Sequence, residues 1–332
     1  MYLCSVKTLT FPMKVTIHTD TATLPALPSG SYFHSRELME LCLRTPRHKP
    51  YMAVVTDDNG KAIANLLAVE RYRHAWLPPQ LHRHVRILGE GAYAEKPANM
   101  IFSMMLDALT RKLQGRTLYM EVSHLSQKMF GYAPLRAAGY FPVRWMSIHN
   151  SHHSHSPEER INERQRQRIE TAMARGIETH EVESEEDYKH FFRLLHRHYW
   201  FKPRKFVPAD DFFKEMQKAG RCKMLITTYR GKTLGCAIYV YSDGDAYLWY
   251  SASRRKSYAT LHPNAVTFWN TIRYTYNNKC KHIRFMDVGL PFRRNPYRDF
   301  ILSFGGKEVS TFRWFHTRLK CFNRLASWLW RE

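Results

Sequence analysis

The hydrophobic positions of the chain follow a strand-like period in some segments and a helical period in others, and the same order of segments occurs twice. In the second half, residues 222–229, 233–241 and 246–251 are strand-like segments separated by turn residues, which predicts an antiparallel meander. In the first half, residues 52–56 and 62–69 flank an Asn-Gly turn, which predicts a β-hairpin. In both halves a helical pattern and a further strand follow.

The two helical patterns are related by a constant offset. Both follow a proline, which is favoured in the first turn of a helix. The same 166 positions separate Pro97 from Pro263, Phe102 from Phe268, Leu106 from Ile272, and Met120 from Met286. This repeat is far longer than the ~20–50 residues of a solenoid unit, so each copy is predicted to be a domain-sized unit.

We therefore expect an α/β (α+β) fold of two tandem domains, each with a mixed, mostly antiparallel sheet flanked by helices. The expected parts are a first domain at 13–150, a polar linker and charged connecting helix at 151–176, a second domain at 177–314 and a basic amphipathic C-terminal helix at 315–332. The charged helix itself is expected over residues 158–175. Met13 is as good a start as Met1, and nothing near either of them is typical of a secretory signal.

Charge narrows the kind of partner. The 332 residues carry 51 Lys and Arg against 29 Asp and Glu, a formal net charge of +22. Such an excess favours anionic partners, such as nucleic acid, phosphate-bearing ligands or anionic lipid, although a merely basic surface is the plain alternative. The six cysteines contain no C-x-x-C pair, which fits a reduced, cytoplasmic compartment. No apolar run reaches the ~20 residues that a membrane span needs.

Three segments resemble the Gcn5-related N-acetyltransferase (GNAT) family, in its tandem FemABX and BioF2-like branch. They are Phe33-His34-Ser35, the arginine-rich stretch that ends at residues 172–177, and the closing segment 300–306 with its Gly305-Gly306 pair. The resemblance spans residues 13–315. It implies transfer of an acyl group to an amine, with no tightly bound cofactor and with acyl-CoA, acyl-carrier protein or aminoacyl-tRNA as the donor.

Two departures from the family pattern affect the choice of donor. Ile301 stands where the family often has a lysine, which weakens the aminoacyl-tRNA interpretation. Neither residues 89–94 nor residues 254–259 reproduce the glycine-rich loop that holds the coenzyme pyrophosphate in simple acetyltransferases. Ordinary acetyl-CoA binding is therefore not the expectation for either half.

Asp287 is the predicted catalytic residue, because it ends a central strand just before Gly289 and could accept the proton of the amine or orient the amine. A structural aspartate that caps the next turn is the alternative, and Glu121 holds the equivalent place in the first half. The second half is favoured for its basic surroundings. The predicted substrate-binding residues are Arg254, Arg255, Lys256, His262, Arg293, Arg294, Tyr297, Lys307 and Trp200.

For Arg254, Arg255 and Lys256 the expected role is a grip on a phosphate before a helix start; a solvated basic loop is the alternative. Trp200 belongs to an aromatic and basic loop that either lines an acceptor groove or packs between domains. The 18 histidines form no pattern typical of a metal site, so no metal is expected.

The C-terminal segment carries Phe315, Leu319, Phe322, Ala326, Leu329 and Trp330 on one predicted face and cations on the other. This pattern predicts either a peripheral attachment to an anionic membrane, on its inner face, or docking on the second domain. The function expected for the whole chain is N-acyl transfer. The alternative is a basic RNA-binding or membrane-tethering module that has lost catalysis.

Overall fold

A computed structural model describes residues 13–72, 82–126, 128–153, 155–200, 202, 206–254, 256–286 and 288–329. The chain divides into two compact units. Unit 1 comprises Met1–Val143 and Trp314–Glu332, and unit 2 comprises Arg144–Arg313. Compared with the expected domain ranges, the connecting segment 151–176 belongs to unit 2 and the C-terminal segment 315–332 belongs to unit 1.

Unit 1 contains a mixed sheet in the order β1-β2-β3-β4-β6-β13, with β5 paired to β3. Its elements along the chain are β1 (Lys14–His18), η1 (Tyr32–His34), α1 (Arg36–Arg44), β2 (His48–Thr56), β3 (Ala62–Arg71), β4 (His84–Leu88), β5 (Ala92–Tyr93), α3 (Asn99–Leu113), β6 (Tyr119–Ser123) and α4 (Tyr132–Ala137), then β13 (Lys307–Thr317) and α11 (Lys320–Leu329). β13 contributes its last residues, from Trp314, to this unit.

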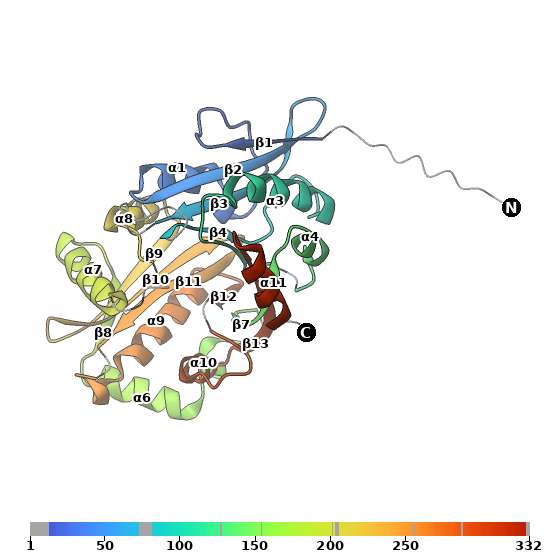
Figure 1. Ribbon diagram of the computed structural model, residues 1–332. Helices are drawn as coiled ribbons and strands as arrows, with labels where there is room; N and C mark the ends of the chain where they lie inside the picture. The colour runs from blue at the N-terminus through green and yellow to red at the C-terminus, as the bar shows by residue number, and fades with distance from the viewer. Residues whose placement is uncertain are drawn as a thin grey trace. The chain divides into compact units, whose positions relative to one another are not determined.

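Unit 2 contains strands paired in the order β7-β12-β11-β10-β9-β8 (Figure 1). Its elements are β7 (Phe141–Ser151, from Arg144), α5 (Pro157–Arg160), α6 (Glu163–Ala174), β8 (Glu178–Glu181), α7 (Glu185–Tyr199), α8 (Asp210–Lys218), β9 (Cys222–Tyr229), β10 (Lys232–Ser242), β11 (Asp245–Ser253), η2 (Ala259–Leu261), α9 (Pro263–Asn277), β12 (His282–Phe285) and α10 (Pro296–Leu302).

The order of elements repeats along the chain. Apart from the short elements β5 and η2, three strands, a helix, a parallel strand, a short helix and a last strand follow one another as β2-β3-β4-α3-β6-α4-β7 and again as β9-β10-β11-α9-β12-α10-β13. The predicted fold class, a mixed sheet flanked by helices, is confirmed. The repeated hydrophobic pattern thus corresponds to a repeated order of elements.

Both predicted helices bury the side chains that define their period. Phe102 and Leu106 of α3 are fully buried, and Phe268 and Ile272 of α9 are almost fully buried. The ring of Phe268 stacks on Phe285 of β12 with centroids 6.0 Å apart. Helix α9 is therefore fixed to the sheet through the same positions that predicted it.

Two predicted helices need correction. The expected helix over 158–175 is broken into α5 and α6, because buried Ile161 is extended and the Asn162 side chain caps α6 by accepting a hydrogen bond from Arg164 N (3.0 Å). The C-terminal helix begins at Lys320 and not at residue 315. Phe315 lies in β13 opposite Glu121 of β6, because ladder pairing continues to Thr317.

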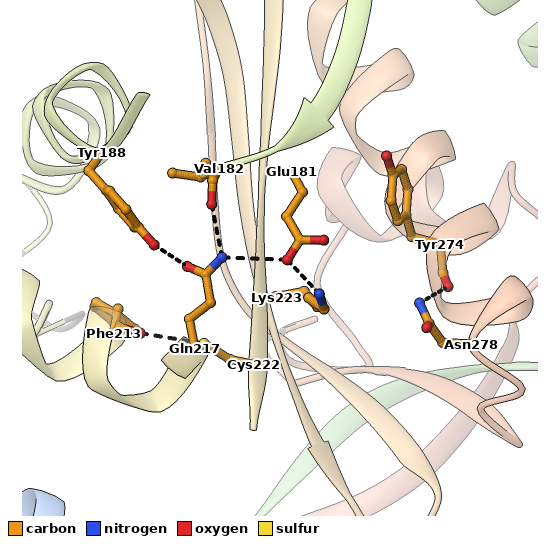
Figure 2. A network of polar contacts seen from close by, with 9 residues as sticks. All are labelled: Glu181, Val182, Tyr188, Phe213, Gln217, Cys222, Lys223, Tyr274 and Asn278. Atoms are coloured by element: carbon orange, nitrogen blue, oxygen red, sulfur yellow. Dashed lines mark hydrogen bonds and ion pairs between the residues drawn. The ribbon is translucent and has the colours of Figure 1, made fainter. Parts of the chain in front are cut away.

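A polar network fixes α7 and α8 to the edge of the unit 2 sheet (Figure 2). Gln217 of α8 donates to the carbonyl oxygen of Val182 (2.9 Å) and accepts from the hydroxyl of Tyr188 on α7 (3.1 Å). Lys223 of β9 donates to the carboxylate of Glu181 at the end of β8 (2.5 Å). These contacts orient α7, whose last residue reaches the site described next.

Candidate functional site

The parallel strands β11 and β12 of unit 2 pair over only part of β11. The register runs from Ala246 opposite Ile283 to Leu248 opposite Phe285, while β11 continues to Ser253. Backbone N–H and C=O groups are obligatory hydrogen-bonding groups, so the edge of β11 beyond Leu248 needs partners other than β12. We call this edge, residues 249–253, the open edge of β11.

A β-bulge shapes the open edge. On β10, Ile238 lies opposite Tyr250 and the next residue, Tyr239, lies opposite Leu248, so Trp249 is an extra residue in β11. A bulge bends its strand and re-aims side chains. Here it turns two consecutive aromatic rings toward α8: Trp249 stacks on Phe212 and Tyr250 meets Phe213 edge-on.

Tyr199, the last residue of α7, covers part of the open edge. Its hydroxyl group donates to the carbonyl oxygen of Ser251 (3.1 Å) and accepts from the N–H of Ser251 (3.4 Å). In an antiparallel strand, the N–H and C=O of one residue point to the same side. Because both groups of Ser251 contact the same hydroxyl, Tyr199 lies on the side of β11 that faces away from β10.

The loop from Arg254 to His262 connects the open edge with the start of α9, and cations surround it. Two cations come from the loop itself, Arg254 and exposed Lys256, and Arg175 donates from its guanidinium to Thr260 O (3.3 Å). Burial lowers the pKa of His262, and the nearby charges of Arg168 and Arg175 lower it further. The side chain of His262 is therefore mainly neutral at neutral pH among these fixed cations.

The start of α9 lies close to the end of β11. Gly235 of β10 pairs with Ser253, and a Cβ atom at this glycine would collide with the hydroxyl of Thr267 in the first turns of α9. The positive end of the helix dipole therefore adds to the charge of the loop. The Nε atom of Arg254 is buried and has no hydrogen-bond partner among the described residues.

Three side chains hold the segment after β12 by hydrogen bonds to its carbonyl groups. Arg313 donates to Met286 O (2.6 Å), Asn295 donates to Val288 O (2.5 Å) and Arg298 donates to Leu290 O (3.0 Å). The guanidinium of buried Arg313 also lies 4.0 Å from the ring centroid of Trp145. Asp287 itself lies outside the described residues, but the carbonyl groups on both sides of it are fixed.

The other predicted site residues fall into two groups. Arg254, Lys256 and His262 share the loop before α9, and Arg255 lies outside the described residues. Arg293, Arg294 and Tyr297 share the segment before and within α10, where the two arginines are exposed and Tyr297 packs edge-on against Phe268 of α9.

Two predicted residues stand apart from both groups. Lys307 is exposed at the start of β13, and Trp200 is 77% exposed just after Tyr199. Sequence reasoning selected Trp200 but not its neighbour Tyr199. It named the arginines of α6 only as part of a charged connecting helix. It also placed Arg313 among the cations of the C-terminal helix, whereas Arg313 is buried in β13.

The counterpart of the open edge is closed in unit 1. β4 pairs with β6 along its whole length, from His84 to Leu88, and Gly89 N continues the pairing to Ser123 O (2.7 Å). The carboxylate of Glu90 then accepts from the N–H (2.8 Å) and the hydroxyl (2.5 Å) of Ser126. No comparable edge of β4 is left in unit 1 for a ligand to pair with.

Buried His34 fixes the loop that follows β4 in unit 1. Its Nδ1 accepts from Leu67 N (3.0 Å), and Gly91 N lies 3.1 Å from its Nε2. Burial lowers the pKa of His34 to about 4, so the ring is neutral. In the part of the chain that the structure describes, no group of His, Cys, Asp and Glu side chains could hold a metal ion.

Comparisons with known proteins support the same fold. Residues 160–294 match the family model described as "Acetyltransferase (GNAT) domain", which covers the open edge and the loop before α9. The crystal structure of FemX is similar with a TM-score of 0.61 and 10% sequence identity, over 90% of this chain and 95% of FemX. The expected FemABX-type fold is thereby confirmed. No curated protein matches the sequence.

Two further solved structures are similar. The structure of L-PGS from Bacillus licheniformis has a TM-score of 0.54 and 11% identity, over 83% of this chain and 88% of that one. A tandem GNAT protein from the clavulanic acid biosynthesis pathway has a TM-score of 0.51 and 11% identity, over 85% and 87%. The matched family model and the shared fold support an acyltransferase.

Proposed function

We propose that the protein is an N-acyltransferase that moves an acyl or aminoacyl group from an activated donor to an amine, with the donor bound along the open edge of β11. The observation that carries this proposal is the contrast between the units. In unit 2 the parallel strands β11 and β12 separate beside a cationic helix start. In unit 1 the corresponding strands β4 and β6 stay paired along all of β4, and Glu90 closes their end.

The open edge suits a donor that contains amide or carbonyl groups, because a strand edge offers N–H donors and C=O acceptors in a fixed line. An N–H group aimed at the reacting carbonyl stabilises the negative charge that develops on its oxygen during attack. The aromatic wall of Trp249 and Tyr250 lies at the same edge. These features orient a donor without a covalent enzyme intermediate.

The proposed acyl transfer makes one bond, breaks one bond and moves one proton. The lone pair of a neutral amine forms the new C–N bond, and the bond from the carbonyl carbon to the leaving sulfur or ester oxygen breaks. The amine proton passes to a base, for which we propose Asp287, and the protonated base then gives a proton to the leaving thiolate or alkoxide. Arg313 and Asn295 serve as positioning residues, since they hold the carbonyl groups on either side of Asp287.

The cationic loop before α9 suits a phosphate on the donor. Arg254 has a buried Nε atom with no acceptor among the described residues, and Lys256 is exposed. Coenzyme A, a phosphopantetheine arm and tRNA all carry phosphate, so the shared chemistry is a phosphate next to a carbonyl donor. An aminoacyl donor is one of the possibilities to test, because two of the similar structures favour it. They are L-PGS and the C-terminal domain of a putative lysylphosphatidylglycerol synthetase from Agrobacterium fabrum.

Arg254→Ala tests this proposal in a binding experiment on the full chain. Coenzyme A and deacylated tRNA are titrated separately into the wild type, Arg254→Ala and the matched control Arg193→Ala, an exposed arginine of α7. We expect one of the two probes to bind and Arg254→Ala to weaken that binding at least fivefold, with Arg193→Ala unchanged. Equal binding by the wild type and Arg254→Ala, or no binding of either probe, would refute the proposed donor site.

A further inference from the structure

Helix α11 docks on unit 1 through its polar side. Asn323 donates to Gly139 O (3.1 Å) and accepts from Thr317 N (2.8 Å), and Ser327 accepts from Arg136 of α4 (3.1 Å). Asn323 and Ser327 lie four positions apart and therefore share one face of the helix. Figure 1 shows α11 in dark red beside α4.

The opposite face of α11 carries its large apolar side chains. Phe322 is 52% exposed, Leu325 is 54% exposed and Trp328 is 63% exposed. With about 100° between consecutive residues of a helix, the centre of these three lies roughly 180° from the centre of Asn323 and Ser327. The helix therefore packs with its polar side inward and its apolar side outward, the reverse of the usual arrangement in a soluble protein.

Charge identifies what covers this face. Exposed Arg324 lies on α11 and exposed Arg318 just precedes it, and the sequence of α11 contains no Asp or Glu. The whole chain carries a net charge of +22, so a second copy would be repelled, whereas an anionic surface would be attracted. At ten residues, α11 is too short to cross a bilayer, and none of the helices in the described part of the chain is long and apolar enough to do so.

We propose that α11 lies in the plane of an anionic lipid bilayer, with Phe322, Leu325 and Trp328 inserted at the boundary between headgroups and acyl chains. A helix with aromatic and leucine side chains on one side and flanking cations binds such a surface through both the apolar area and the charge. The polar contacts of Asn323 and Ser327 fix the helix to unit 1, so insertion needs no unfolding. This inference is independent of the donor site.

The main experiment is sedimentation of the full chain with vesicles of phosphatidylcholine alone and with vesicles that contain one quarter phosphatidylglycerol. We expect binding to the phosphatidylglycerol vesicles that weakens as salt is raised. The triple variant Phe322→Ser, Leu325→Ser, Trp328→Ser should bind at least tenfold more weakly. The control Met129→Ser removes a side chain of unit 1 that is 63% exposed and should bind like the wild type.

A second measurement covers the case in which the triple variant folds poorly. Cys321 is exposed beside the apolar face, whereas Cys42, Cys222, Cys236 and Cys280 are buried, so an environment-sensitive fluorophore can be attached there in a Cys4→Ser background. If α11 inserts, the emission of the fluorophore should shift to the blue on phosphatidylglycerol vesicles, and brominated acyl chains should quench it.

An unshifted label, equal vesicle binding by a folded triple variant, or a concentration-dependent dimer that the triple variant abolishes would overturn the proposal. The last outcome would assign the apolar face of α11 to a second copy of the chain.

Discussion

The hydroxyl group of Tyr199 satisfies both backbone groups of Ser251, at 3.1 Å from the carbonyl oxygen and 3.4 Å from the nitrogen. A donor amide that extends the sheet along β11 would need these same two groups. If the donor binds as proposed, Tyr199 competes with it for the open edge and has to move aside.

Tyr199→Phe should tighten donor binding. Loss of both hydrogen bonds of the hydroxyl group, at ~0.5–1.5 kcal/mol each, predicts a Michaelis constant for the donor that falls at least about fivefold, with turnover nearly unchanged. Tyr188→Phe is the matched control, because its hydroxyl group on the same helix bonds Gln217 and not β11. Steady-state kinetics with varied donor checks this prediction. A large drop in turnover for Tyr199→Phe would instead give its hydroxyl a direct role in the reaction.

Asp287→Asn should leave folding near normal and lower turnover at least tenfold, because the amide can no longer accept the proton of the amine. Single-turnover rates across pH report the step directly. Asp299→Asn, at an exposed position of α10, is the comparison and should retain full activity. Unchanged turnover in Asp287→Asn would remove this residue from the mechanism.

Glu90→Ala should lower the stability of the fold without changing the binding of the donor. The carboxylate of Glu90 holds two groups of Ser126, at a partly exposed position, so its loss should lower the free energy of unfolding by about 0.5–1.5 kcal/mol. Thermal unfolding and donor kinetics are measured side by side, with exposed Glu95→Ala as the control. A changed Michaelis constant for the donor would show that unit 1 also takes part in donor binding.

Acid should destabilise the fold through buried histidine. Burial lowers the pKa of His34 from 6.5 to about 4, so between these values the unfolded chain binds a proton that the folded chain does not. Stability is therefore full above about pH 6.5 and falls as the pH decreases toward about 4. Urea unfolding at several pH values should show this loss, and His34→Gln should reduce its slope. An identical pH dependence in the variant would assign the loss to other groups.

Local pattern predicted most of the secondary structure. The helices α3 and α9 and the meander β9-β10-β11 were predictable because each alternates or recurs with its own period and ends in turn residues. The break at Ile161 and Asn162 was not, because charged residues on both sides continue the same pattern and hide a capping asparagine. The path of β13, which gives Phe315 to the sheet of unit 1, depends on pairing with β6, and no nearby residue encodes it.

The candidate site was predicted in its basic part and missed in its positioning part. Arg254, Lys256 and His262 were identified because they stand directly before a helix start. Arg168 and Arg175 reach the same loop only because α6 packs against it, and Tyr199 reaches Ser251 only because α7 crosses the sheet. Contacts between residues so far apart in sequence arise from tertiary packing and leave no local signal.

Hydrogen exchange measured by mass spectrometry can locate the bound donor without knowledge of the acceptor. The full chain is compared alone, with coenzyme A and with deacylated tRNA. We predict slower exchange over residues 249–262 with one of these probes and no change over residues 84–93. Protection of residues 84–93, or none over 249–262 with either probe, would contradict it.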